Sequence, residues 1–214
     1  MKIGILGSGR VGQTLGSKLL EQGHEVRLGA RNPGKLAEWL ENSGNRASAG
    51  SLAEAAAFGE LLFNCTTGRG SLEALAAAGA GNLGSKVLVD VANPLDFSKG
   101  MLPTLSVCND DSLGEQIQRA YPKLRVVKAL NTINAMLMIN PRQLADGNHD
   151  LPICGNDEQA KQQVTRLLQD DFGWKTVIDL GDITGSRATE MYLIFWFRLR
   201  DRFETPIINT KIVK

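Results

Sequence analysis

The sequence contains few of the residues that most often act as nucleophiles, proton carriers or metal ligands. Of its 214 residues only two are histidine and three are cysteine. The cysteines Cys65, Cys108 and Cys154 stand singly, without a Cys-x-x-Cys or Cys/His spacing. An odd number of isolated cysteines argues against a disulfide framework and against a zinc site, so we expect reduced packing residues and no bound metal. The two histidines, His24 and His149, fall in turn-like or Gly/Asn-rich stretches and are expected to be exposed.

The sequence also lacks an excess of charge of one sign and a long apolar run. It has 24 Lys and Arg against 23 Asp and Glu, a net charge of +1, and no basic stripe or acidic tail. Nucleic acid and anionic membranes are therefore not expected as partners. The apolar run at residues 191–197 is far shorter than the ~20 residues that cross a bilayer. Because residues 1–7 already belong to a folding motif, no cleavable signal is expected and the protein should be cytoplasmic.

What the sequence does contain is a regular alternation of strand and helix patterns. Hydrophobic residues make up 43% and charged residues 22%, as in an ordinary globular protein. Strands are predicted at residues 2–6, 25–29, 46–49, 60–66, 86–92, 125–131, 151–154 and 175–179. Helices are predicted at residues 11–22, 34–42, 51–58, 71–79, 112–121, 156–171 and 188–203, with a helical or irregular piece at 134–144. This order predicts the α/β class, a Rossmann-type doubly wound parallel sheet with helices on both faces.

The domain organisation is predicted to be simple. No internal repeat or low-complexity linker is present, so we expect a single domain over residues 1–214. Residues 151–214 should form a small C-terminal α/β extension of the same sheet. Residues 96–110 are polar, punctuated by Gly and Pro and without a clear period, which predicts a long loop of the kind kept for a function.

The most specific motif lies directly after the first strand. Residues 7–12 read Gly-Ser-Gly-Arg-Val-Gly, a G-x-G-x-x-G that opens the first helix. Gly7 permits the tight turn, Gly9 lets the backbone approach a pyrophosphate, and Gly12 lets the helix pack close to the strand. The amides at the start of the helix then face the anion. The alternative, a plain strand-to-helix turn, does not explain the spacing of all three glycines.

The choice of nucleotide is indicated at the end of the second strand. An NAD-binding protein carries Asp or Glu there to bond the ribose 2′-hydroxyl, but residues 28–35 contain no carboxylate. Arg31 and Lys35 instead suit a 2′-phosphate through charge-assisted hydrogen bonds. We therefore expect NADP(H), with a solvated pair of cations at a helix start as the alternative reading of Arg31 and Lys35.

The ends of three later strands carry small and amide-bearing residues. They occupy residues 65–70, 90–95 and 129–133, and in an open α/β sheet the ligand lies at such strand ends. Asn93 and Asn131 could bond a carboxamide while the small residues let a nicotinamide ring lie flat. The alternatives are that Asn93 caps the turn made with Pro94 and that Asn131 only terminates its strand.

Taken in order, these motifs resemble a known family. Residues 7–12, 29–33, 90–95, 126–132 and 151–156 look like the NADP oxidoreductases that depend on the deazaflavin coenzyme F-420, and are also similar to the cytosolic NADPH-binding domain of transmembrane metalloreductases. The resemblance implies a compact Rossmann domain, commonly a homodimer, that passes hydride between NADP(H) and a flavin-like ring, either a deazaflavin or a flavin. The sequence departs from the family's pattern at two places. Arg10 is bulkier than the residue usual there, and residues 67–70 lack the expected apolar residue and proline. Both departures are expected to change the shape of the acceptor pocket.

The resemblance also assigns roles to matched positions. It implies that the pyrophosphate and ring region is lined by Ser8, Arg10 and Val11, the 2′-phosphate by Arg31, Asn32 and Lys35, the nicotinamide ribose by Thr66 and Thr67, and the hydride-transfer cleft by Asn93, Asn131 and Thr132.

A flavin-like acceptor takes up its own proton, so no catalytic acid or base is required. A carbonyl or imine reductase would need a proton donor, for which Lys128 is the candidate, although a strand lysine more often reaches the surface or a cap. A non-catalytic NADPH-binding redox sensor is the third reading. The apolar residues 191–197 are expected to pack at a two-fold interface and to roof the cleft beside Asn93 and Asn131, or else to close the core of the monomer.

Overall fold

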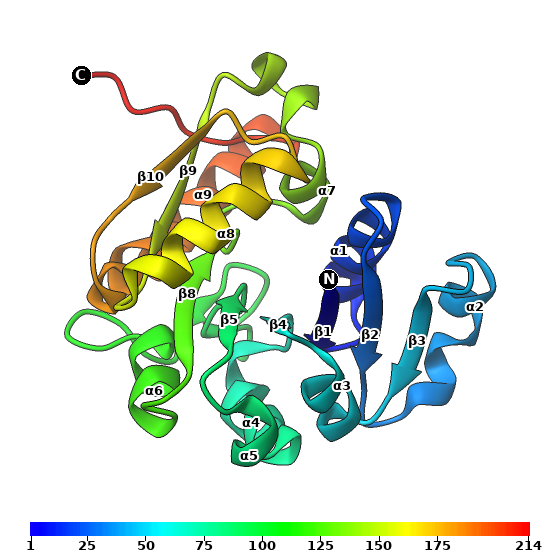
Figure 1. The fold of residues 1–214 in the computed structure, drawn as a ribbon. Coiled ribbons are helices and arrows are strands. Elements are labelled where there is room, and N and C mark those ends of the chain that lie inside the picture. The colour runs from blue at the N-terminus through cyan, green and yellow to red at the C-terminus, as the bar shows by residue number, and fades with distance from the viewer.

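The computed structural model describes residues 1–214 and contains one large sheet flanked by helices (Figure 1). The strand order is β10-β9-β8-β5-β4-β1-β2-β3. The strands span β1 Lys2–Leu6, β2 Glu25–Gly29, β3 Ala47–Gly50, β4 Leu61–Asn64, β5 Val87–Asp90, β8 Arg125–Ala129, β9 Asp150–Cys154 and β10 Thr176–Asp179. The central strands β4 and β5 are buried along their whole length, as expected of parallel strands covered on both faces.

The sheet departs from the prediction in one respect. β9 pairs with β8 in antiparallel register, with Lys128 opposite Cys154, while β10 is parallel to β9. The doubly wound parallel part of the sheet therefore has six strands, β8, β5, β4, β1, β2 and β3. Strands β9 and β10 continue the sheet but run in the opposite direction. Strand direction depends on how the connection after β8 returns to the sheet, which the strand residues themselves do not encode.

The helices follow the predicted order. They span α1 Arg10–Glu21, α2 Ala37–Glu41, α3 Leu52–Phe58, α4 Ser71–Ala78, α5 Ala80–Leu83, α6 Leu113–Ala120, α7 Ala135–Ile139, α8 Glu158–Asp170 and α9 Ser186–Phe203. Short 3₁₀ turns lie at Pro33–Leu36, Gly68–Gly70, Pro141–Gln143, Ala145–Gly147 and Ile183–Gly185. The predicted helix at 34–42 is thus divided into a 3₁₀ turn and α2. The cap of α8 is Asp157, whose carboxylate accepts a hydrogen bond from the Ala160 amide at 2.7 Å.

Two hydrophobic clusters fill the two faces of the sheet. The larger has 30 buried residues and joins α1, α7 and α8 to one face, and the smaller has 15 and joins α3, α4 and α6 to the other. These layers hold the carboxyl ends of all parallel strands at one edge. Between β1 and β4 the chain reverses its winding, which makes that edge the point where ligands bind in open α/β sheets.

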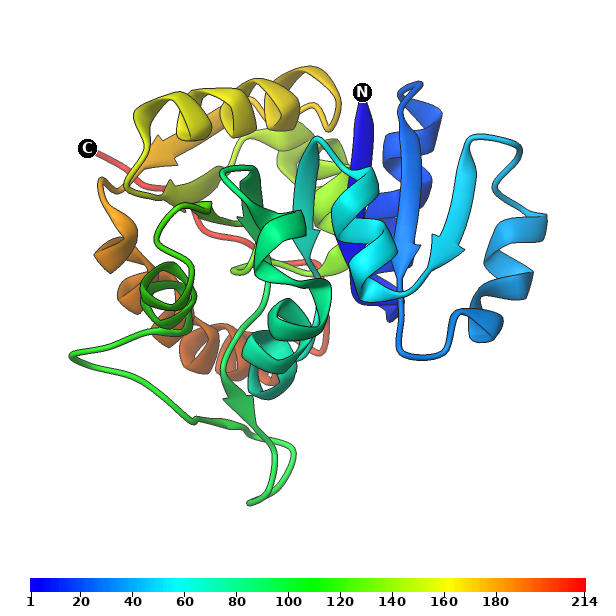
Figure 2. The same ribbon diagram turned by 60° about the horizontal axis from the view of Figure 1, so that its bottom comes forward.

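The predicted long loop contains a small hairpin that projects from the body of the protein (Figure 2). Strands β6 Leu95–Asp96 and β7 Thr104–Leu105 pair in antiparallel register. The hairpin remains close to α9, since the Phe97 and Phe197 rings meet edge to face with centroids 6.0 Å apart.

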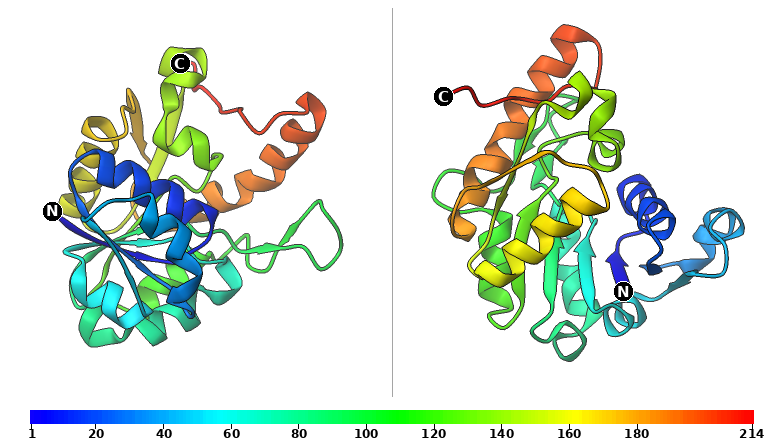
Figure 3. Two further views of the ribbon diagram at one scale, coloured as in Figure 1. Left: turned by 90° about the vertical axis from the view of Figure 1, so that its right-hand side faces the viewer. Right: turned by 45° about the horizontal axis from the view of Figure 1, so that its top comes forward.

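Helix α9 and the C-terminal tail cover the end of the sheet that carries β9 (Figure 3). Leu193, Trp196 and Phe197 of α9 form a third, small buried cluster. Met191 and Phe195 point outward instead and are 36% and 55% exposed. None of the helices combines the length and the apolar content that a membrane span requires.

Candidate functional site

The glycine turn after β1 has the geometry of a surface that a ligand approaches closely. A Cβ on Gly12 would lie 2.2 Å from the Gly7 carbonyl oxygen, so only glycine lets α1 pack this close to β1. Gly7 itself has φ +118°, a conformation that other residues rarely adopt. A Cβ on Gly9 would meet no atom within 4 Å. The fold therefore does not require glycine at position 9, whereas an anion lying against the backbone does.

Gly9 opens onto a cleft of about 340 Å³ at the switch point of the sheet. One wall consists of Gly7, Ser8 and Gly9, and the loop after β2 contributes Gly29, Ala30 and Arg31. The opposite wall comes from residues 65–67 after β4 and from Glu73, Ala74 and Ala77 of α4. The small residues of this wall leave room for a flat group, and the residues present fit an adenine dinucleotide.

The three residues predicted for the 2′-phosphate lie together on the exposed segment after β2. Arg31 lines the cleft. Asn32 caps the following 3₁₀ turn by accepting a hydrogen bond from the Gly34 amide at 3.2 Å. Lys35 is exposed one residue further and has no ion pair. The two cations are thus free to meet an anion at the rim of the cleft.

A second hollow of about 540 Å³ continues from the first. Both hollows are lined by Cys65, Thr66 and Thr67, so the loop after β4 forms the boundary that they share. Val11 of α1, Asn93 after β5 and the hairpin residues Leu95 and Phe97 line the rest, together with Gly68, Arg69, Val91, Ala92, Asp96 and Ser98. An extended dinucleotide in the first cleft would direct its nicotinamide end into this hollow.

The predicted residues Asn93, Asn131 and Thr132 do not all face the hollow. Asn93 lines it, and its side-chain amide donates to the Asn131 carbonyl at 2.8 Å. The Asn131 amide returns a bond of 2.9 Å to Asn93 Oδ1, so Asn131, only 2% exposed, stands behind Asn93. Thr132 is 3% exposed and lines a different cavity, next to α9 and the tail. Arg10 is exposed at the start of α1 and lines neither hollow.

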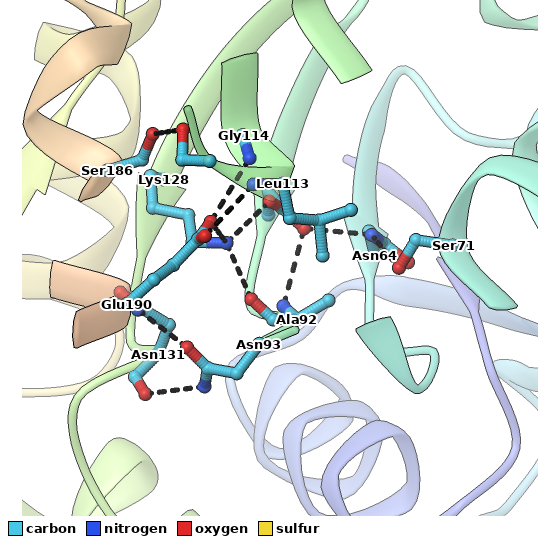
Figure 4. A network of polar contacts seen from close by, with 12 residues as sticks. Asn64, Ser71, Ala92, Asn93, Leu113, Gly114, Lys128, Asn131, Ser186 and Glu190 are labelled. Atoms are coloured by element: carbon cyan, nitrogen blue, oxygen red, sulfur yellow. Dashed lines mark hydrogen bonds and ion pairs between the residues drawn. The ribbon is translucent and has the colours of Figure 1, made fainter. Parts of the chain in front are cut away.

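Behind this end of the cleft lies a buried polar network (Figure 4). Lys128 of β8 is fully buried, contrary to the expectation that it reaches the surface or a cap. Its ammonium group bonds Asp90 at 2.8 Å, Glu190 of α9 at 2.7 Å and the Ala92 carbonyl at 2.5 Å. Burial alone would lower the pKa of Lys128, but the two carboxylates outweigh it and raise that pKa. Lys128 therefore remains charged near neutral pH and does not touch the hollow.

The ionisable groups that do line the second hollow are poor proton donors. Burial, with a contribution from Asp90, raises the pKa of the Cys65 thiol far above its usual range. Hydrogen bonds from Ser98 and the nearby Arg69 lower the pKa of Asp96, which is therefore an anion near neutral pH. The lining of the hollow contains no histidine, lysine, tyrosine or glutamate, the side chains that most often act as proton donors together with aspartate.

Both histidines lie far from the cleft, and the prediction that His149 is exposed was wrong. His149 is 3% exposed, bonds the Pro141 carbonyl and Asn209, and packs edge-on against Trp174. The prediction was wrong for His24 as well, because its side chain is only 11% exposed and bonds Asp171 at 2.9 Å. A third hollow, of about 680 Å³, includes His24 but lies at the opposite, amino end of the strands and contains none of the predicted site residues.

Some residues of the cleft were not predicted. The wall from α4, Ala74 and Ala77, shows a small-residue spacing of one helical turn that could have indicated it. The hairpin residues Leu95 and Phe97 fall within segments predicted to matter, 90–95 and 96–110, but their place beside Val11 was not predicted, because only the folded chain brings them together.

The fold, the glycine turn and the cleft at the switch point define a dinucleotide-binding protein of the Rossmann type. The family described as "NADP oxidoreductase coenzyme F420-dependent" matches residues 2–94. The crystal structure of a candidate F420-dependent NADP reductase from Arthrobacter sp. FB24 is 48% identical, covers 100% of both chains and superposes with a TM-score of 0.96. The chain belongs to this family of NADP-dependent oxidoreductases.

Two further proteins of known name are similar in sequence to this chain over part of their length. The metalloreductase STEAP3 of Rattus norvegicus is 32% identical over 190 residues, which are 88% of this chain and 36% of that protein. The F420-dependent NADP reductase of Methanocaldococcus jannaschii is 34% identical over 112 residues, 50% of this chain and 48% of that protein. The chain thus matches about a third of the metalloreductase and about half of the archaeal reductase.

Proposed function

We propose that the protein transfers hydride between NADPH and a flavin-like acceptor, a deazaflavin such as coenzyme F-420 or a flavin. The observation that carries this proposal is the second hollow, which continues from the dinucleotide cleft and contains no group able to donate a proton near neutral pH. A flavin-like ring provides its own nitrogen as the proton site, whereas a carbonyl or an imine requires a donor from the protein. The one candidate donor, Lys128, is held away from the hollow by two carboxylates.

The proposed roles follow the positions of the residues along the cleft. NADPH supplies a hydride at its nicotinamide ring when bound. Residues 7–12, with Ser8, Arg10 and Val11, hold the pyrophosphate and the adjoining ring region. Arg31, Asn32 and Lys35 hold the 2′-phosphate, and Thr66 and Thr67 bond the nicotinamide ribose. Asn93, backed by Asn131, forms the wall against which the two rings meet, whereas Thr132 lines the separate cavity beside α9 and the tail and takes no place in this wall.

For hydride transfer the protein needs only to hold two flat rings face to face and to exclude water. Holding the reacting groups in this way accounts for a large part of the rate enhancement in such reactions. The apolar side chains of Val11, Leu95 and Phe97 suit a ring system of that kind. The metalloreductase relatives suggest a metal chelate as the final electron acceptor. Such a chelate would receive its electrons from a flavin that had first accepted the hydride in the same hollow.

The test is NADPH oxidation with a panel of acceptors. The panel contains a 5-deazaflavin, FMN, FAD, ferric chelates, and a cyclic imine and a ketone as controls. We expect steady NADPH oxidation with at least one flavin-like acceptor and none with the imine or the ketone. Tight NADPH binding without oxidation by any acceptor would indicate a redox sensor, and oxidation by the imine or the ketone alone would indicate a reductase of that class.

A further inference from the structure

The buried cluster of Lys128, Asp90 and Glu190 lies behind the cleft, and none of its side chains lines either hollow. All three side chains are at most 1% exposed. Their formal charges sum to −1, so the cluster has one carboxylate more than a neutral ion pair requires. Removing two carboxylates and an ammonium from water is costly, and an equally large apolar cluster often gives a more stable protein. A role in stability alone therefore explains the cluster poorly.

The cluster connects four segments that are distant in sequence. Lys128 belongs to β8, Asp90 to the end of β5 and Glu190 to α9. The Glu190 carboxylate also accepts hydrogen bonds from the Leu113 and Gly114 amides, at 2.9 and 3.1 Å, at the start of α6. The ammonium group of Lys128 makes three bonds, as many as it has protons, and the third goes to the Ala92 carbonyl.

That third bond reaches the wall of the cleft. The Ala92 carbonyl belongs to the peptide group joined to Asn93, and Asn93 in turn exchanges two bonds with Asn131. The loop that lines both hollows packs on the same backbone, because a Cβ on Gly68 would lie 2.1 Å from the Asn93 carbonyl oxygen. The position of Asn93 therefore determines where the loop after β4 lies.

A second branch reaches the cleft through Asp90. Asp90 Oδ1 accepts from the Asn64 amide at 2.8 Å, and Asn64 Oδ1 accepts from the Thr66 hydroxyl at 2.7 Å. The amide of Asn64 interrupts any path for protons between Thr66 and Lys128, because a neutral amide does not readily take up or release a proton. The network can orient groups, but it cannot relay protons.

We propose that Lys128 and Glu190 are positioning residues that set Asn93 and Thr66, and through them the nicotinamide end of the cleft. This inference rests on the proposed function in so far as the ligand is NADPH, and it does not depend on the identity of the acceptor. Residues at the adenosine end, such as Arg31 and Ser8, have no bond to the cluster. The two ends of the cleft should therefore respond differently when the cluster is altered.

The test compares Glu190→Gln with a control that also joins α6 to α9. Glu115 is 6% exposed and accepts two bonds from Arg187 of α9, but it has no bond to the residues of the cleft. Glu115→Gln should therefore reproduce a loss of thermal stability without altering the cleft. In Glu190→Gln one carboxylate oxygen becomes an NH₂ group that faces N–H donors, so at least one of its three bonds is lost.

Two readouts separate the two ends of the cleft without an acceptor. Adenosine 2′,5′-bisphosphate probes the adenosine end, and we expect its Kd in Glu190→Gln to lie within about twofold of wild type. The rise in dihydronicotinamide fluorescence when NADPH binds probes the other end, and we expect it to fall to roughly half or less. Where a flavin-like acceptor is turned over, kcat should fall about tenfold or more with little change in the KM for NADPH, because small displacements of reacting groups are costly.

Lys128→Arg provides a second variant that retains the charge if Glu190→Gln does not fold. A planar guanidinium cannot direct three diverging bonds to Asp90, Glu190 and Ala92 as an ammonium does, so the same loss of fluorescence enhancement is expected. Wild-type fluorescence enhancement in the folded variants, with stability lowered as in Glu115→Gln, would overturn the inference. Failure of the wild type to bind either nucleotide would overturn the proposed function as well, while failure to reduce any acceptor would leave the binding readouts decisive.

Discussion

At the scale of the residue, the cleft depends on a few side chains whose size and charge suit one ligand. Arg31 stands at the rim, in the position where a carboxylate would select the other nucleotide. Gly9 presents bare backbone to the cleft, with free space where its Cβ would be. Neither residue is required by the packing of the protein, so each can be changed with little effect on the fold.

Replacement of Arg31 by Ala should weaken NADPH binding by about 1–3 kcal/mol, the value of a lost charge-assisted hydrogen bond. Binding of NADH should be nearly unchanged, because it has no 2′-phosphate. Titration calorimetry with both nucleotides measures the difference. Lys123→Ala, which removes an exposed cation far from the cleft, should affect neither nucleotide, and equal wild-type affinity for NADPH and NADH would contradict the assignment.

Replacement of Gly9 by Val should abolish dinucleotide binding and leave the protein folded. The new side chain would occupy the space in which the backbone meets the pyrophosphate, and it would clash with no protein atom. Circular dichroism should stay native while the NADPH fluorescence enhancement disappears. Gly81→Val is a matched control, because a Cβ there also meets no atom within 4 Å but Gly81 lies in α5, outside the cleft. Undiminished binding by Gly9→Val would place the nucleotide elsewhere.

At the scale of the element, α6 is fixed by carboxylates at its amino end. Ser112 caps the helix, and Glu190 of α9 accepts from its first two amides, as the helix dipole favours. Asp111, just before the cap, accepts two hydrogen bonds of 2.9 Å from Arg119 near the other end of α6. These bonds to Arg119 lower the pKa of Asp111 from 3.8 to about 2. The stability of this helix should therefore depend on pH in the acid range.

The direction of that dependence follows from the lowered pKa. As the pH falls, the unfolded chain protonates Asp111 before the folded protein does, so the stabilisation is complete above pH 3.8 and is lost as the pH approaches about 2. The difference in free energy of unfolding between wild type and Asp111→Asn should shrink over this interval and should also be smaller in high salt, because the pair is partly exposed. Denaturant titrations at a series of pH values measure it. A difference that stays constant over this pH interval for Asp111→Asn would refute the assignment.

At the scale of the whole molecule, apolar side chains remain exposed on the projecting hairpin and on the outer face of α9. Phe97 is 47% exposed, Met101 75% and Phe195 55%. The inner face of α9 closes a small cluster of the chain itself, as the core-closing reading predicts, and the two-fold interface stays a prediction. We propose that the outer face lies at a homodimer interface in a cytoplasmic protein folded as one domain. Truncation after Gly185 should give insoluble protein, because it removes Glu190, which pairs with the buried Lys128, and the apolar cluster of α9 that packs against Leu95.

The homodimer is tested by light scattering at micromolar concentration. The full-length protein should have twice the 23.2 kDa mass of the chain. Phe195→Asp should reduce the mass to that of one chain, because a charge buried in an apolar interface is costly. Leu72→Asp, at an exposed apolar residue of α4 on another part of the surface, should remain dimeric. A monomeric mass for the wild type would leave α9 with its core-closing role alone.

The parts of the structure that sequence determined are those with local causes. The bounds of β1 and β2 agree with the prediction, and the capping box of Ser51 and Glu54 forms as its spacing indicates. The glycine turn could also be predicted, because Gly7 has a positive φ and Gly12 lies against the Gly7 carbonyl oxygen, both within a few residues. Such features need only the backbone preferences and periodicity of neighbouring residues, which the sequence displays directly.

Only the tertiary structure decided which side chains meet across the sheet. Lys128 reads as an ordinary strand lysine, but Asp90, 38 residues away, and Glu190 of α9 make its burial possible. His149 is buried for a similar reason, since Asn209 and Trp174 enclose it. Thr132, three residues past the end of β8, lines a cavity beside α9 and the tail, while Asn93 lies at the cleft. A charge or a polar group is buried only where distant segments supply its partners, and those partners are determined by the packing of the whole chain.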